Sequence, residues 1–217
     1  MDTHTVVAID GPAASGKSAA ARTLAKKLAF VYVNSGAMYR AVTWVALQKG
    51  IATDDSQAVI SLLHDMQIEC GLANNESNIR INGMNPEPFL NDEAVNHNVS
   101  NIASVGEVRE ILVAKQREYA QHSDLVKEGL DIGTVVFPHT PYKFYIDASL
   151  EVRAQRRARQ GLRDEISARD RRDSTRRASP LMIAEDSHVI DSSNLTIDGV
   201  VGEIIGRLKL KGLKINY

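Results

Sequence analysis

The sequence predicts an α/β protein in which a five-stranded parallel sheet carries helices on both faces. Three observations predict this class: short apolar runs rich in β-branched residues, helical patterns after most of them, and polar or Gly-containing turns between. Strands that alternate with helices pair in parallel and are covered on both faces. The five runs are Val6–Ile9, Val31–Val33, Leu125–Val126, Lys143–Ile146 and His188–Ile190.

Length and charge restrict the class of protein further. A chain of 217 residues is long enough for one large α/β domain, and we expect a single domain over residues 1–217. The formal net charge of −1 gives no general attraction to nucleic acid or anionic lipid. No apolar run approaches the roughly 20 residues of a membrane span, and the N-terminus lacks a signal-peptide pattern. With one cysteine, Cys70, these features predict a cytoplasmic protein without membrane or nucleic-acid partners. We also expect a monomer, although these features do not reveal the oligomeric state.

Residues 11–18 have the spacing G-x-x-x-x-G-K-[ST] of a phosphate-binding loop. They follow an apolar run and precede a helix-like stretch at 19–28, and both flanks disfavour an ordinary Gly-rich turn. Backbone N–H groups and the helix N-terminus of such a loop face phosphate oxygens. The candidate phosphate-binding residues are Gly11, Pro12, Ala13, Ala14, Ser15, Gly16, Lys17 and Ser18. Lys17 is also a catalytic candidate that reaches the terminal phosphates, and the Ser18 hydroxyl is a candidate Mg²⁺ ligand.

Several polar or glycine residues lie just past the strand-like runs. They are Asp10-Gly11, Asn34-Ser35-Gly36, Glu128-Gly129 and Asp147. In an open parallel sheet the ligand site lies at the carboxyl ends of the strands. We therefore expect these positions to surround the site.

The stretch from about Ile68 to Val95 departs from the alternation of strands and helices. Residues 79–83 alternate apolar and polar side chains and end in Asn82-Gly83, a hairpin turn signal. Two prolines that follow argue against a helix. We predict a small antiparallel subdomain inserted at residues 65–97. From Val99 to His122 the apolar spacing predicts a helix.

Residues 151–177 contain ten arginines, five acidic residues and no lysine. A charge run is often a solvated helix face, but arginine suits bidentate phosphate binding, whereas either cation serves solvation. We interpret the segment as an Arg-rich helical lid. Arg169, Asp173 and Arg176 are spaced to share one helix face, either as a surface salt-bridge ladder or as a clamp on phosphate or ribose.

The chain resembles bacterial cytidylate kinases over roughly residues 5–210. The motifs that carry the resemblance are the phosphate loop, Ser35 to Arg40 (SGAMYR), Gly129 to Pro138 (GLDIGTVVFP) and Arg169 to Arg176. The phosphate loop is shared with many NTPases, and the second and third motifs are far more specific. The resemblance implies transfer of the γ-phosphoryl group of ATP to CMP or dCMP with Mg²⁺. It also implies a five-stranded parallel core, a mobile lid and an insertion in the monophosphate-binding region.

The resemblance further implies roles for individual residues. Those implied to bind substrate are Ser35 and Arg40 at the monophosphate, Ser100, Arg109 and Asp131 at cytosine, Arg169 and Asp173 at the ribose, and Arg176 at phosphate. Those implied to act in catalysis are Lys17, Arg153, Arg157 and Arg176. A cytosine edge offers an amino donor, which a carboxylate accepts, and two acceptors, which arginine and serine satisfy. Uracil presents a carbonyl to the carboxylate instead, which predicts a preference for CMP over UMP.

Leu130 departs from the family, which has arginine in contact with phosphate at this position. Loss of one such charge-assisted contact costs on the order of 1.5–3 kcal/mol. Two alternatives therefore stay open: a kinase for another acceptor such as UMP or AMP, and a nucleotide-binding module with little catalysis. A switch GTPase or transporter ATPase is disfavoured, because the sequence has neither an Asn-Lys-x-Asp motif nor a Leu-Ser-Gly-Gly-Gln motif.

Overall fold

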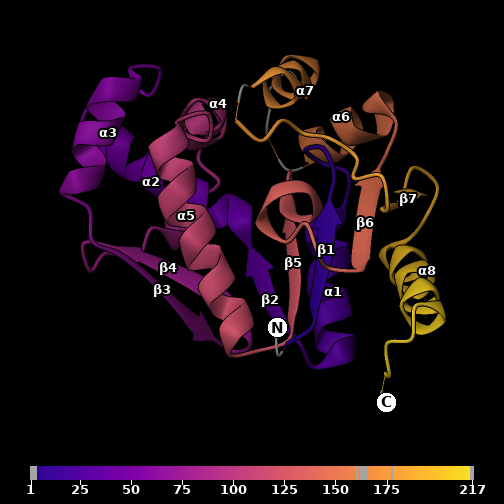
Figure 1. Cartoon of the computed structure of the whole chain (residues 1–217). Helices are drawn as coiled ribbons and strands as arrows, with labels where there is room; N and C mark the ends of the chain where they lie inside the picture. Colours follow the sequence, from indigo (N-terminus) through magenta and orange to yellow (C-terminus); the bar gives the residue numbers. More distant parts are fainter. Residues whose placement is uncertain (1–3, 160, 162–165, 177, 216–217) are drawn as a thin grey trace.

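The computed structural model describes residues 4–159, 161, 166–176 and 178–215 (Figure 1). The described chain forms a sheet with helices on both faces, as the sequence predicts. The strands are β1 (Val6–Asp10), β2 (Val31–Asn34), β3 (Ile68–Ala73), β4 (Glu76–Ile81), β5 (Leu125–Gly129), β6 (Tyr142–Asp147) and β7 (His188–Asp191). The α-helices are α1 (Lys17–Leu28), α2 (Ser35–Gln48), α3 (Ser56–His64), α4 (Glu93–Ile102), α5 (Gly106–Glu118), α6 (Leu150–Arg159), α7 (Ile166–Thr175) and α8 (Ile197–Leu210).

The sheet has the strand order β3-β4-β2-β5-β1-β6-β7. The five predicted strands form its parallel part, from β2 to β7. The expected count of five is wrong for the whole sheet, because the inserted strands join its edge. β4 pairs in parallel with β2 through Tyr32 and Glu76, and β3 pairs antiparallel with β4.

Two separate apolar cores cover the two faces of the sheet. On one face, helices α2 to α5 pack on alternate residues of the strands, including Ala8 and Val33. On the other face, α1 and α8 pack against each other and on Val7 and Ile9. Both faces of an inner strand such as β1 are therefore buried, which is why its signal in the sequence is continuous rather than alternating.

The inserted hairpin differs from its prediction in the position of its turn. The connection between β3 and β4 is Asn74-Asn75, and both residues have left-handed backbone angles, as a two-residue hairpin turn requires. Asn82-Gly83 forms a second tight turn after β4, which brings Ile81 and Met84 together. The antiparallel pairing is confirmed, and the error arose because Asn-Asn is a weaker turn signal than Asn-Gly.

The helix expected from Val99 to His122 is two helices. α4 ends at Ile102, and α5 begins at Gly106. Between them the Ser104 hydroxyl and N–H both donate to the Asn101 carbonyl, so a local turn competes with continuation of the helix.

The Arg-rich segment forms α6 and α7, which lie above the carboxyl ends of the strands (Figure 1). In the described part of the chain, no helix combines the length and apolar character needed to cross a membrane.

Candidate active site

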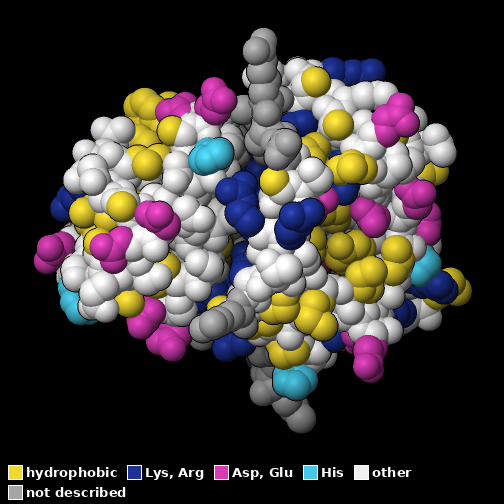
Figure 2. All heavy atoms as spheres, turned by 90° about the horizontal axis from the view of Figure 1, so that it is seen from above, with side chains coloured by type: hydrophobic (Ala, Val, Ile, Leu, Met, Phe, Trp, Pro, Cys, Tyr) yellow, Lys and Arg dark blue, Asp and Glu magenta, His cyan; other side chains and the backbone are white. Residues whose placement is uncertain are grey.

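A cleft of about 750 Å³ opens at the carboxyl ends of the parallel strands. The phosphate loop, the start of α2, the end of β5 and both lid helices line it. Viewed from above, Lys and Arg side chains gather in the central hollow of the molecule (Figure 2). The cleft therefore offers concentrated positive charge, which suits a polyanionic ligand.

The phosphate loop runs from β1 into α1, and its geometry depends on Gly11. A Cβ at this position would lie 2.1 Å from the Ile146 carbonyl oxygen, so only glycine fits. Of the eight predicted loop residues, the six from Ala13 to Ser18 line the cleft, whereas Gly11 and Pro12 do not. The Lys17 ammonium donates to the Pro12 carbonyl at 2.9 Å. Burial lowers the pKa of Lys17, and the nearby carboxylate of Glu128 opposes this shift.

Ser18, the predicted Mg²⁺ ligand, donates its hydroxyl to the Glu128 carboxylate at 3.0 Å. Glu128 is buried at the end of β5 and also accepts a hydrogen bond from the Tyr32 hydroxyl at 3.3 Å. The sequence analysis placed Glu128 just past a strand but gave it no role. Its place at the carboxyl end of a predicted strand was the available signal.

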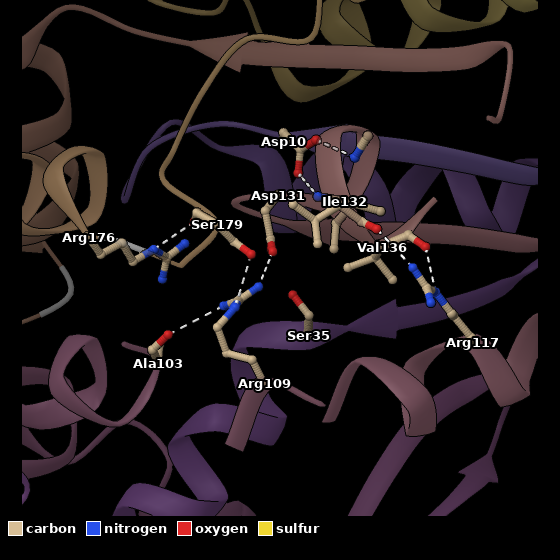
Figure 3. Close-up of polar contacts among 12 residues, drawn as sticks. Asp10, Ser35, Ala103, Arg109, Arg117, Asp131, Ile132, Val136, Arg176 and Ser179 are labelled. Carbon is tan, nitrogen blue, oxygen red and sulfur yellow. Dashed lines mark hydrogen bonds and ion pairs between the residues drawn. The ribbon is translucent and has the colours of Figure 1, made fainter. Parts of the chain in front are cut away.

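The same cleft is lined by a buried ion pair between Arg109 and Asp131 (Figure 3). Arg109 comes from α5, and Asp131 follows β5. The guanidinium also lies 5.5 Å from the centre of the Tyr39 ring. The structure thus brings together Arg109 and Asp131, two of the three residues expected to bind the cytosine base.

Asp10 holds the backbone next to Asp131 in place. Its carboxylate accepts hydrogen bonds from the N–H groups of Ile132 and Gly133, both at 2.7 Å (Figure 3). These residues begin a turn of π-helix at Ile132–Val136. Burial raises the pKa of Asp10 to about 7, although the two backbone hydrogen bonds oppose the shift. Asp10 therefore ties β1 to the turn that presents Asp131.

The expected monophosphate residues lie at the start of α2. The Ser35 hydroxyl donates to the Glu128 carbonyl at 2.8 Å. A Cβ on Gly36 would approach the Arg40 guanidinium to 2.7 Å, so the glycine makes room for this side chain. Arg40 donates to the Asn96 side chain at 3.4 Å, and Arg157 of α6 donates to the same oxygen at 3.3 Å. Asn96, which no sequence motif marks, thus joins the two arginines.

The lid residues of α7 face the cleft, with one correction to their helical placement. Arg169 and Asp173 are buried on α7, and Nε of Arg169 lies 3.8 Å from Oδ2 of Asp173. Arg176 lies just after the last residue of this helix, so the three do not share one helix face. All three nevertheless line the cleft. The Ser100 hydroxyl donates to Asp173 at 3.0 Å, which joins the expected base and ribose residues.

Arg153 is buried beneath the phosphate loop and does not line the cleft. It pairs with Asp170 at 2.7 Å and donates to the Ala13 carbonyl at 3.4 Å. Arg156, which the sequence analysis did not single out, lines the cleft and bonds the Ser15 carbonyl and Ser192. These two side chains connect α6 to the loop.

A phosphate loop and lid arginines around one cleft define a P-loop phosphotransferase. Two solved kinase structures share the fold: a gluconokinase from Sinorhizobium meliloti 1021 and a shikimate kinase from Acinetobacter baumannii. Their TM-scores are both 0.50, at 11% and 13% identity, and they cover 98% of this chain and 99% and 97% of their own chains.

The family follows from sequence comparison. The cytidylate kinase family model matches residues 7–210, and the chain belongs to this family. Cytidylate kinases from Clostridium botulinum (strain Loch Maree / Type A3) and Geobacillus sp. (strain WCH70) are both 42% identical to it. Each alignment covers 94% of this chain, with 97% and 96% of the respective relative.

Proposed function

We propose that the chain transfers the γ-phosphoryl group of ATP to CMP, and to dCMP, in a direct in-line reaction that uses Mg²⁺. One observation carries this proposal: a phosphate loop and a buried Arg109–Asp131 pair line a single cleft. The loop suits the phosphates of the donor, and the ion pair suits the base of the acceptor. The family assignment supports both halves.

Transfer between two phosphates needs positioning and charge neutralisation rather than a covalent intermediate. Lys17 contacts the transferring group, and Arg157 and Arg176 of the lid neutralise the charge that develops on it. The acceptor is already a phosphate oxygen, so no general base is required. Closure of the lid excludes water, which would otherwise accept the phosphoryl group.

Ser18 and Glu128 fit the requirements of a Mg²⁺ site. Their oxygens lie 3.0 Å apart at the edge of the cleft, next to the phosphate loop. Mg²⁺ prefers hard oxygen ligands and is usually held by one or two protein oxygens together with water and substrate phosphates. When bound, the ion supplies positive charge to the phosphate oxygens of ATP.

Hydrogen-bond chemistry explains the proposed choice of base. Asp131 accepts from the cytosine amino group, while Arg109 and Ser100 donate to its ring nitrogen and carbonyl. A uracil carbonyl placed against the buried carboxylate leaves both groups without a donor. The pair therefore selects cytosine by penalising uracil.

The remaining residues serve the acceptor and the loop. Ser35 and Arg40 bind its phosphate, and Arg169 and Asp173 bind its ribose. The buried position of Arg153 supports a role in holding the phosphate loop rather than in contacting phosphate.

The test is turnover with CMP, dCMP, UMP and AMP at fixed ATP, with and without Mg²⁺. We expect kcat/KM for CMP to exceed that for UMP and AMP by at least about 100-fold, because the base site is built from hydrogen-bonding groups. Removal of Mg²⁺ should abolish turnover with every acceptor. Equal turnover of CMP and UMP would contradict the assignment of the base site.

A second candidate, a nucleotide-binding module with little catalysis, is favoured by one observation. Leu130 lines the same cleft as the base residues and the phosphate loop, and the family has arginine at its position. Tight CMP binding without formation of CDP would support this candidate over the kinase.

Leu130→Arg should raise kcat/KM with CMP by about 10-fold or more, the equivalent of one charge-assisted hydrogen bond to phosphate. Leu130→Met is the matched control, because it changes the shape of the side chain without adding charge. No gain with arginine would mean that the cleft arginines already supply this contact.

We also propose that the enzyme acts as a cytoplasmic monomer on small molecules. The near-neutral charge supports the absence of a nucleic-acid partner. Size-exclusion chromatography with light scattering tests the monomer.

A further inference from the structure

Ser179 contacts two guanidinium groups that belong to different parts of the cleft (Figure 3). Its hydroxyl oxygen accepts from Nε of Arg109 at 3.0 Å, and its carbonyl oxygen accepts from Nε of Arg176 at 2.8 Å. Arg109 comes from α5, whereas Arg176 directly follows the lid helix α7. One residue therefore connects the base end of the cleft to the end of the lid.

Among the described residues, the bonds of Arg109 leave two of its N–H donors for a ligand. Besides Ser179, its guanidinium bonds the Ala103 carbonyl at 3.4 Å and pairs with Asp131. These bonds use three of the five N–H groups of an arginine. Because a guanidinium is planar, the acceptor on Nε fixes the plane in which the other two donors point. Ser179 thus sets the direction from which Arg109 approaches a base.

Arg176 is held in the same way. Its Nε bonds Ser179, while its Nη2 is buried and has no hydrogen-bond partner among the described residues. The side chain lines the cleft. Burial lowers the pKa of Arg176, the carboxylates of Asp173 and Asp131 oppose this, and the like charge of Arg109 adds to it. Two guanidinium groups that repel each other therefore share the oxygens of one residue.

The backbone of Ser179 is unusual and consistent with this task. Its φ is 52°, in the left-handed region that serine rarely adopts. Non-glycine residues in such conformations are strained and concentrate at functional sites. This conformation presents the hydroxyl and the carbonyl to two different partners.

We propose that Ser179 is a positioning residue for base selection, which orients Arg109 toward cytosine and ties that orientation to Arg176 of the lid. This inference rests on the proposed function, because it assumes that Arg109 reads the base. Ser179 touches no reacting atom. Its effect is expected in KM and in the choice of base more than in kcat.

The test compares Ser179→Ala and Ser179→Gly with the wild type, using CMP and UMP as acceptors. Both variants lack the hydroxyl, and glycine accepts a left-handed φ without strain. We expect each to raise KM for CMP by about 10-fold and to reduce the CMP/UMP ratio of kcat/KM by a similar factor, because one hydrogen bond to a charged group is lost. Ser179→Asn, which retains an oxygen acceptor and tolerates this φ, should restore much of the ratio.

Ser174→Ala is the matched control. Within the described part of the chain, this exposed serine of α7 bonds only the Arg171 carbonyl, and its loss should leave both KM and the ratio unchanged. An unchanged CMP/UMP ratio in both hydroxyl-free variants would overturn the proposal. Failure of the wild type to prefer CMP would instead refute the base assignment, so the two failures are distinguishable.

Discussion

Asp131→Asn is expected to lower kcat/KM for CMP by at least about 100-fold. The reason is that the cytosine amino group loses its carboxylate acceptor at a site built from hydrogen-bonding groups. The same change should lower kcat/KM for UMP much less, since an asparagine amide can donate to the uracil carbonyl. It also leaves the buried guanidinium of Arg109 without its carboxylate partner. Removal of one partner of a buried pair costs about 3–5 kcal/mol, and we expect the lower end because asparagine retains an oxygen acceptor.

Steady-state kinetics with both acceptors and urea denaturation measure these effects. Asp198→Asn is the control, because Asp198 forms an exposed ion pair with Lys27. That pair should contribute at most about 1 kcal/mol to the free energy of unfolding and should not affect the choice between CMP and UMP. If Asp131→Asn reduced turnover of CMP and UMP by the same factor, Asp131 would not read the base.

The second large effect concerns Lys127, a lysine without any exposed surface in the central strand β5. It lies in register with Ala8 on one side and Val33 on the other. Its ammonium nitrogen has no hydrogen-bond partner among the described residues. Burial lowers the pKa of Lys127 to about 7, and the nearby carboxylates of Glu128 and Asp131 oppose the shift.

This pKa makes the free energy of unfolding depend on pH. In the unfolded chain Lys127 holds its proton up to about pH 10, whereas in the folded chain it loses the proton above about pH 7. Between these values the unfolded state binds more protons, so stability rises with pH. Asp10, whose raised pKa is also about 7, acts mainly at lower pH. Burial also raises the pKa of Cys70, which opposes the trend only above about pH 8.5.

Lys127→Met should therefore raise the free energy of unfolding at pH 7 by about 3–5 kcal/mol, since one pKa unit corresponds to about 1.4 kcal/mol. Urea denaturation at pH 7.0, 7.75 and 8.5 checks this. Stability of the wild type should rise across the series, whereas the variant should show a flatter profile. Lys26→Met is the control, because it removes an exposed lysine of α1. It should change the free energy of unfolding by no more than about 0.5 kcal/mol at any of the three pH values. A variant less stable than the wild type would show that the ammonium has a stabilising partner.

Most of the fold could be predicted because its signals are local. Strands β1 and β2 are largely continuous apolar runs, since both of their faces are buried under helices. The extension of the sheet could not be predicted, because the pairing of β4 with β2 involves only Tyr32 and Glu76. The break between α4 and α5 also escaped prediction, since the Ser104 turn that causes it interrupts an otherwise suitable apolar spacing.

Part of the candidate site could be predicted from the sequence, and part could not. The phosphate loop was recognisable because its chemistry depends on consecutive residues, from Gly11 to Ser18. Glu128, Asn96 and Ser179 were missed, because each acts on a side chain that lies far away in the sequence. No spacing rule links such partners.

The sequence by itself determined the class of protein, since strand periodicity and the loop motif both arise from backbone geometry over a few residues. Only the tertiary structure decided which side chains meet in the cleft. Arg109 and Asp131 are 22 residues apart, and Ser18 and Glu128 are 110 apart. Their contacts depend on the packing of whole helices and strands, and therefore on the fold that brings the carboxyl ends of β1 and β5 together.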